Sequence, residues 1–229
     1  MENTEPKQDK PDTLKRMASV VSHELRNPLA IISNSTYFIK TKLSAGGAAP
    51  DPKVTKHIGI IEGEVKRSND VIEEMLSFTR EREITKARIS LNALVGDLAA
   101  QYQCPPSVTL KVNTDPADLA VDADAAAITS ALRYVLDNAV QAMPEGGALT
   151  AEVSQAGKLA LLTVTDGGPG LPDGDGEKIF EAFFTTKPRG VGLGLTLARK
   201  YLRQHGGDAT AANAPGGGAK VTLSLPLPG

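Results

Sequence analysis

Apolar residues recur at helical spacing in the first part of the chain. Between residues 12 and 43 they are separated by three, four or seven residues, which places them on one face of a helix. These positions are Leu14, Met17, Val21, Leu25, Ile32 and Ile39. Small residues and prolines interrupt the pattern at 44–52, so the first helix is expected to end near Leu43.

A second helical pattern follows this interruption, with steps that alternate between four and three residues. Its positions are Val54, Ile58, Ile61, Val65, Ser68, Ile72, Met75 and Thr79. The charged residues of the same stretch, including Glu64 and Arg67, are expected on the other faces. Two helices joined by a short turn predict an antiparallel hairpin.

One hairpin cannot bury this apolar stripe from both sides. Two copies that pair into a four-helix bundle would bury it, so the pattern predicts a homodimer. The alternative is that the stripe packs against the C-terminal half of the same chain.

The heptad pattern is lost at residues 80–87, a charged stretch that we interpret as a linker. We therefore expect a disordered lead-in at 1–11, a helical domain at 12–83 and a second domain at 84–229. The second domain mixes short strands with helices and is predicted to be α+β, with a sheet covered on one face. Strands are expected at 88–91, 108–112, 119–121, 148–153, 158–165 and 220–225, and helices at 94–102, 125–143 and 193–204.

Composition narrows the class of protein. The chain has 229 residues, 41% of them hydrophobic and 23% charged, with a net charge of -2. This balance gives no reason to expect nucleic acid as a partner. The single cysteine, Cys104, excludes an internal disulfide. We expect no membrane segment, because no apolar run approaches about 18 residues. The polar N-terminus does not resemble a signal peptide, so a cytoplasmic location is expected.

A histidine with an acid beside it stands out on the first helix, in the run Ser22–Leu29. Neutral imidazole is a nucleophile near physiological pH, and Glu24 could take the proton that His23 must lose on attack. Pro28 lacks an N–H and would loosen the helix one turn later. Taken alone, His23 fits an ordinary helix residue better, and the motifs in the other half of the chain reverse this interpretation.

Glycines concentrate in the C-terminal half, where they form two short motifs. Asp166-Gly167-Gly168-Pro169-Gly170 follows a predicted strand; a carboxylate fixed there could accept a hydrogen bond from an exocyclic amine, and the glycines would let a planar ring approach. Gly190-Val191-Gly192-Leu193-Gly194 opens a predicted helix, and such loops offer N–H groups to phosphates. Each motif alone is also compatible with a plain turn.

Two further features lie around these loops. Asn138 on the preceding helix carries an amide oxygen, a ligand that suits Mg²⁺ when substrate phosphates share the ion. Three of the five phenylalanines fall in Ile179–Lys187, beside a Gly- and Pro-rich stretch. We interpret this arrangement as a lid anchored at one end, with Lys187 able to reach phosphate oxygens.

Together these motifs resemble those of the bacterial sensor histidine kinases. His23-Glu24-Leu25-Arg26-Asn27-Pro28 is similar to their H-box, and the motifs at Asn138, 166–170, 180–184 and 190–194 are similar to their N, G1, F and G2 boxes. The order and spacing also match, over residues 12 to 229. The sequence at 183–187 and the short lid are similar to those of the nitrogen-regulator-like branch of these kinases.

The resemblance implies a dimerisation and phosphotransfer hairpin followed by a Bergerat-fold ATP-binding domain. It implies that His23 attacks the γ-phosphate of ATP with Glu24 as base, and that Asn27 orients water for dephosphorylation. For the nucleotide it implies one set of ligands, with Asn138 also holding Mg²⁺. This set is Asn138, Asp166, Gly168, Gly170, Lys187, Gly190, Gly192 and Gly194.

Two positions depart from the family pattern. Tyr134 stands where an earlier asparagine of the N-box is common, and Gln141 stands where a phosphate-contacting lysine is common. Both departures bear on the strength of phosphate binding. Tyr134 also occupies the place where ATP-hydrolysing relatives keep a glutamate base, which argues against an ATPase of the chaperone or topoisomerase kind.

The function expected from the sequence is an ATP-dependent protein-histidine kinase that transfers the phosphoryl group from His23 to an aspartate of a response regulator. Phosphatase activity toward that regulator is also expected. The alternatives are a catalytically idle dimeric adaptor of the same fold and a serine-kinase-like regulator, which would lack the helical hairpin. We identify no sensor domain in the sequence, and two interpretations stay open: an excised kinase core, or a stand-alone kinase that takes its input from a separate protein.

Overall fold

The computed structural model describes residues 10–44, 51–79, 83–171, 176–187 and 190–229, with side chains from Glu24 onward except those of Arg26 and Ser44. The chain divides into two compact units. The first comprises Met1–Thr79 and the segment Thr185–Val191, and the second comprises Arg80–Phe184 and Gly192–Gly229. Each unit is described by itself. In the described part of the chain, no helix combines the length and apolar character needed to cross a membrane.

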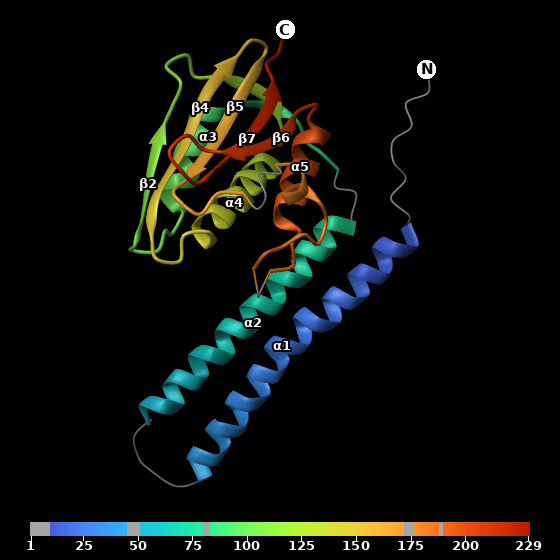
Figure 1. Cartoon of the computed structure of the whole chain (residues 1–229), viewed down its shortest axis with the longest axis vertical. Coiled ribbons are helices and arrows are strands. Elements are labelled where there is room, and N and C mark those ends of the chain that lie inside the picture. The colour runs from blue at the N-terminus through green and yellow to red at the C-terminus, as the bar shows by residue number, and fades with distance from the viewer. Residues whose placement is uncertain (1–9, 45–50, 80–82, 172–175, 188–189) are drawn as a thin grey trace. The chain divides into compact units, whose positions relative to one another are not determined.

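The first unit is built on a hairpin of two long helices, α1 (Lys10–Ser44) and α2 (Pro52–Thr79) (Figure 1). α1 continues through Pro28, although this residue cannot donate the ladder hydrogen bond to the carbonyl of Glu24. α2 starts with proline at its first position, where no N–H is needed. Just before it, the Asp51 carboxylate accepts a hydrogen bond from the Lys53 N–H at 2.8 Å.

The apolar stripe of α2 divides between two faces. Val54, Val71 and Met75 are buried between the two helices. By contrast, Ile58 and Val65 keep 44% and 45% of their surface exposed. One hairpin therefore covers only part of the predicted stripe, and alternate members of the pattern lie on the flank of the helix.

A five-stranded sheet organises the second unit, in the order β2-β4-β5-β7-β6 (Figure 1). β2 pairs in parallel with β4, and the other neighbours pair antiparallel. The strands are β2 (Val108–Asn113), β4 (Gly147–Ala156), β5 (Leu159–Asp166), β6 (Asp208–Asn213) and β7 (Ala219–Pro226). A separate two-stranded ladder joins β1 (Ala87–Ser90) to β3 (Ala120–Ala123).

Three helices pack against the sheet: α3 (Leu91–Gln101), α4 (Ala125–Gln141) and α5 (Gly194–Gln204). On β5, Ala160, Leu162 and Val164 are buried, and the alternating positions show which face the helices cover. Two side chains cap helices: Ser90 accepts from the Ala93 N–H for α3, and Asp124 accepts from the Ala127 N–H for α4. A short 3-10 turn, η2 (Lys178–Phe180), precedes α5.

The predicted fold class, a helical hairpin followed by an α+β sheet domain, is confirmed. One strand was missed: β6 has the sequence Asp-Ala-Thr-Ala-Ala-Asn and shows no alternation of apolar and polar residues. Alanine has low strand propensity, so β6 depends on its pairing with β7. The lead-in at 1–9 and residues 80–82 of the expected linker lie outside the described residues.

Candidate active site

The H-box lies on α1, and its acidic residue contacts the second helix. Glu24 is only 7% exposed, and its Oε2 forms an ion pair with Nη2 of Arg67 at 2.8 Å. Asn27 lies one turn further along α1 and is half-buried. The backbone of His23 is helical, and its side chain lies outside the described residues.

Arg67 is a residue of this site that sequence reasoning placed wrongly. We expected it on a charged outer face of α2, but the structure places its half-buried guanidinium against Glu24. Two ions leave water at considerable cost unless they pair with good geometry, which explains why the two side chains meet. Glu64, three residues earlier and also expected outside, is 8% exposed. The sequence did contain a signal for this pair: an acidic residue on one predicted helix and a basic residue on the other, at positions that an antiparallel hairpin brings side by side.

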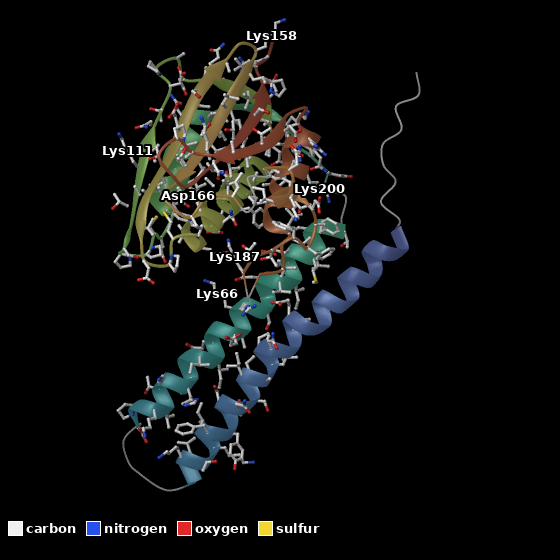
Figure 2. The ribbon with its side chains drawn as sticks, viewed as in Figure 1. Lys66, Lys111, Lys158, Asp166, Lys187 and Lys200 are labelled. Carbon is white, nitrogen blue, oxygen red and sulfur yellow. The ribbon has the colours of Figure 1, made fainter. Side chains whose placement is uncertain are left out.

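Asp166 ends β5 with its carboxylate buried and oriented (Figure 2). Its Oδ1 accepts two backbone hydrogen bonds, from the Gly168 N–H at 2.9 Å and from the Ala219 N–H at 3.1 Å. Among the described residues, no group donates a hydrogen bond to the other oxygen, Oδ2. The strand end therefore holds one carboxylate oxygen and leaves the second to receive a donor such as an exocyclic amine.

The loop after Asp166 must contain glycine where the backbone passes close to other atoms. A Cβ on Gly168 would lie 2.9 Å from Oδ1 of Asp166 and 3.1 Å from the Ala142 carbonyl oxygen, at the end of α4. Further along, Gly170 lies against Asn213, whose Oδ1 accepts a hydrogen bond from the Leu171 N–H at 2.7 Å. Asn213, at the end of the missed strand β6, therefore supports this loop and was not identified from the sequence.

Asn138 lies in the last turns of α4 and is half-buried. Beside it, Asp137 Oδ1 accepts a hydrogen bond from the Tyr102 hydroxyl at 2.7 Å. Burial and this hydrogen bond raise the pKa of Tyr102 well above its usual value. Gln141, the second position that departs from the family pattern, is exposed.

Tyr134 connects α4 to the start of α5. A Cβ on Gly194 would lie 3.3 Å from the ring of Tyr134, so the glycine lets the N-terminus of α5 approach this ring. The residue that departs from the family pattern thus packs under the glycine loop.

The glycine loop also contacts the phenylalanine segment, which we define as Glu177–Phe184. The Phe183 N–H donates to the Gly192 carbonyl oxygen at 2.9 Å. Gly192 has φ +73, and a Cβ there would lie 2.5 Å from the Phe184 carbonyl oxygen. This close approach leaves no room for a side chain at residue 192.

Two predicted site residues lie in the Thr185–Val191 segment, which belongs to the first unit. The Lys187 N–H donates to Oγ1 of Thr185 at 3.1 Å, and a Cβ on Gly190 would lie 2.8 Å from the same oxygen. Within the second unit, the structure brings predicted site residues together in two local groups. The first is Asp166 with Gly168 and Gly170, and the second is Gly192 with Gly194 next to the Asn138 helix.

The donor set suits a shared magnesium ion rather than a site made by the protein alone. Among the described residues, no group of three or more His, Cys, Asp or Glu side chains could hold a metal. Mg²⁺ usually takes one or two protein oxygens and completes its shell with waters and substrate phosphates. A single amide oxygen, at Asn138, is consistent with this mode of coordination.

Two family models match the chain. Residues 13–84 match the His Kinase A (phospho-acceptor) domain, and residues 123–229 match the histidine kinase-, DNA gyrase B- and HSP90-like ATPase. The signal transduction histidine-protein kinase AtoS of Escherichia coli (strain K12) is 32% identical over 220 residues. The sensor histidine kinase ZraS of the same strain is 30% identical over 217 residues. The chain belongs to the bacterial sensor histidine kinases.

The kinase core spans only part of these relatives. The matches cover 94% of this chain and 35% of AtoS, and 93% of this chain and 46% of ZraS. Among solved structures, histidine kinase ThkA in complex with response regulator protein TrrA is similar over 97% of this chain and 64% of that one, with a TM-score of 0.78 and 28% identity. The ThkA catalytic domain alone matches 64% of this chain, with a TM-score of 0.56 and 30% identity.

Proposed function

We propose that this kinase core autophosphorylates His23 with ATP and transfers the phosphoryl group to an aspartate of a response regulator. The observation that carries the proposal is the Asp166 carboxylate, which has one oxygen fixed by loop N–H groups and the other available for the adenine amine. The same chain carries the H-box helix with an acid beside the histidine. The expected ATP use agrees with the ATPase family model over residues 123–229.

The proposed chemistry has four steps of electron and proton movement. A ring nitrogen of His23 attacks the γ-phosphorus of ATP, and the bond from that phosphorus to the bridging oxygen of ADP breaks. The proton of the imidazole passes to Glu24. The bond from the histidine nitrogen to phosphorus then breaks as a carboxylate oxygen of the regulator takes the phosphoryl group. The ring takes a proton back from Glu24, which restores neutral histidine and the Glu24 carboxylate. Such transfers depend mainly on positioning and charge neutralisation.

The nucleotide ligands keep the roles expected from the resemblance. Asp166 would read the adenine amine, with Gly168 and Gly170 giving the ring access. Lys187 and the loop Gly190–Gly194 would contact the phosphates. Asn138 would hold Mg²⁺, which neutralises phosphate charge when bound. Asn27 would orient a water for dephosphorylation of the regulator, because an amide can position water without taking its proton.

We also propose that the kinase core is a homodimer with its domains at 12–83 and 84–229. The exposed apolar side chains on the flank of α2 support the dimer, since a second hairpin would cover them. The regulator partner is supported by the complex of ThkA with TrrA. A separate input protein and a cytoplasmic location complete the proposal. No observation favours an idle adaptor.

The test is incubation with γ-labelled ATP, followed by acid and base treatment of the labelled protein. We expect acid-labile, base-stable label on the parent chain and none on His23→Ala, which should still bind nucleotide. Asp166→Asn should lose binding, because the asparagine oxygen would face the two loop N–H groups and its NH2 would oppose the adenine amine. Label retained by His23→Ala would refute the assignment, and nucleotide binding without any label would favour the adaptor.

A further inference from the structure

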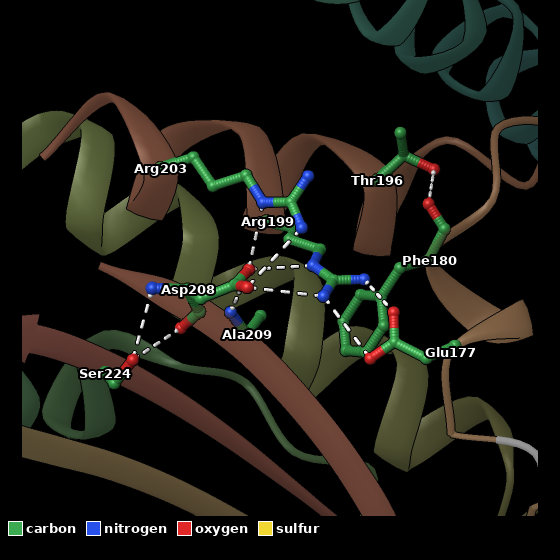
Figure 3. Close-up of polar contacts among 8 residues, drawn as sticks. All are labelled: Glu177, Phe180, Thr196, Arg199, Arg203, Asp208, Ala209 and Ser224. Carbon is green, nitrogen blue, oxygen red and sulfur yellow. Dashed lines mark hydrogen bonds and ion pairs between the residues drawn. The ribbon is translucent and has the colours of Figure 1, made fainter. Parts of the chain in front are cut away.

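A half-buried arginine in the middle of α5 binds two carboxylates at once (Figure 3). The Arg199 side chain is 14% exposed. On one side its Nε and Nη2 contact the two oxygens of Asp208 at 2.7 and 3.3 Å. On the other side its Nη1 and Nη2 contact the two oxygens of Glu177 at 2.6 and 3.3 Å. Both contacts are bidentate, a geometry that lysine cannot reproduce.

The same guanidinium lies over an aromatic ring. Its central carbon is 4.9 Å from the centroid of Phe180, which is buried. One turn earlier on α5, Oγ1 of Thr196 donates to the Phe180 carbonyl oxygen at 3.0 Å. Glu177 and Phe180 are both members of the phenylalanine segment, so α5 holds the start of this segment by charge, ring and backbone contacts.

The charge balance shows how strongly these groups depend on one another. The hydrogen bond to Asp208 raises the pKa of Arg199, and the hydrogen bond to Glu177 adds to it against the cost of burial. Burial opposes ionisation of Asp208, but hydrogen bonds from Arg199 and Arg203 overcome it and hold the pKa of that carboxyl well below its usual value. Arg199 and Asp208 are therefore both ionised at neutral pH.

The two arginines of the cluster differ in the residues that they contact. Arg203 contacts Asp208 through Nε at 3.1 Å and its side chain is 60% exposed. Figure 3 draws no hydrogen bond or ion pair from it to the phenylalanine segment. Asp208 thus keeps a cation if Arg199 is replaced. Within the cluster drawn in Figure 3, Arg199 alone links Asp208 to Glu177 and Phe180.

The phenylalanine segment reaches the glycine loop at its other end. The hydrogen bond from Phe183 to Gly192 and the close approach of Gly192 to Phe184 place the segment against the residues that open α5. Phe183 itself has φ +66, a left-handed conformation that a bulky residue adopts only where its surroundings enforce it. The position of the loop therefore depends on how the start of the segment is held.

We propose that Arg199 is a positioning residue for nucleotide binding, which fixes the phenylalanine segment to α5 and thereby sets the position of the Gly192–Gly194 loop. This inference rests on the proposed function. Arg199 acts through the loop and does not touch the phosphates. It should therefore govern the affinity for ATP, while the rate of phosphoryl transfer at saturating ATP depends on other residues.

The test compares Arg199→Met, Arg199→Lys and the matched control Arg203→Met in the full chain. Dissociation constants are measured with a fluorescent ATP analogue, and KM and kcat are measured from autophosphorylation. Arg199→Met should raise KM about tenfold, because the loss of the link to Glu177 and Phe180 reaches the nucleotide only indirectly, through the loop, and kcat should stay within about twofold. Arg199→Lys should recover part of the loss because it keeps the charge, and Arg203→Met should match the parent.

Glu177→Gln gives a second variant that does not threaten folding, because this side chain is 71% exposed. It should raise KM in the same direction as Arg199→Met and by a smaller factor. Unchanged KM in Glu177→Gln, or equal increases in Arg199→Met and Arg203→Met, would overturn the inference while the proposed function stands. Absence of nucleotide binding by the parent chain would overturn both.

Discussion

At the scale of single residues, the H-box combines two chemistries on one turn of helix. Glu24 follows the proposed nucleophile and carries a carboxylate that can take a proton. Asn27 carries an amide that can orient water but cannot act as a base near neutral pH. The two activities of the kinase core should therefore separate by substitution.

Glu24→Gln should lower the rate of autophosphorylation by about a hundredfold, the lower end of the effect of losing a general base. Asn27→Ala should keep autophosphorylation and lose dephosphorylation of the regulator. The measurement is the initial rate of labelling alongside the lifetime of the phosphorylated regulator for both variants. Equal loss of both activities in each variant would show that the turn acts as one unit.

The ion pair between Glu24 and Arg67 makes a separate prediction about stability. Arg67→Met removes one cation from a buried carboxylate and should lower the free energy of unfolding of the hairpin by about 3 kcal/mol. The double variant with Glu24→Gln and Arg67→Met should recover most of this loss, because no unpaired charge remains. Urea denaturation of the parent, both single variants and the double variant measures the coupling.

Lys66→Met is the control for that cycle, since Lys66 is the exposed neighbour of Arg67 on α2. It should change stability by less than about 0.5 kcal/mol. Independent, additive effects of Glu24→Gln and Arg67→Met would mean that the pair contributes nothing beyond its separate residues.

At the scale of elements, a buried histidine ties the end of α5 to the start of α4. His205 is 2% exposed, and its Nε2 accepts a hydrogen bond from the Asp124 N–H at 3.0 Å. The proton must then be on Nδ1, which lies 2.7 Å from the Tyr201 carbonyl oxygen and donates to it. Asp124 also caps α4, so one junction fixes the two helices that carry Asn138 and the glycine loop.

The cluster around Arg199 makes stability depend on acid pH. The pKa of Asp208 is lower in the folded chain than its ordinary value of 3.8, so its contribution is present above that value and is lost as pH falls below it. Asp208→Asn should destabilise the second unit at pH 7 by no more than about 1 kcal/mol, because the carboxylate is 41% exposed and water screens it.

Denaturation of the parent and Asp208→Asn at several pH values checks this sign. The difference between the two chains should shrink as pH falls from 5 to about 2, because the Asp208 carboxyl of the unfolded parent takes up a proton in this range while that of the folded parent stays ionised. A difference that stays constant over this range would show that packing, and not charge, explains the effect. Thr210→Ala, an exposed change on β6, serves as the control.

How much could be predicted from the sequence differs between elements. Helical and strand periodicity located the hairpin, α4, β5 and β7 because their buried faces are made of large aliphatic residues. β6 was not predicted because its alanines and polar residues show no apolar periodicity. Its formation depends on pairing with another strand. Arg67 and Asn213 escaped for a related reason: their roles arise from contacts between segments that only the folded chain brings together.

At the scale of the whole molecule, the kinase core contains two units whose functions should separate. The H-box lies in the first unit, and Asp166 lies in the second. A substitution that removes nucleotide binding at Asp166 should therefore leave the association of hairpins unchanged. Conversely, a change on the flank of α2 should alter association without altering affinity for nucleotide.

The flank of α2 carries the last prediction. Ile58, Val65 and Ile72 are 44%, 45% and 41% exposed and recur every seven residues along one side of the helix. Complete burial of one such side chain contributes about 1.5–3 kcal/mol, so three on each of two chains would stabilise a dimer substantially. Glutamate keeps helix propensity but would place charge in that interface. Ile58→Glu with Ile72→Glu should therefore convert a dimer to a monomer.

Light scattering at several protein concentrations measures the change in mass, and a fluorescent ATP analogue measures nucleotide affinity in the same samples. Leu159→Glu is the control, because this residue is 39% exposed and lies on β5 of the second unit. It should leave both the mass and the affinity at the parent values. A double variant of α2 that remains dimeric would place the interface elsewhere. A monomer that also lost nucleotide affinity would show that the two units depend on each other.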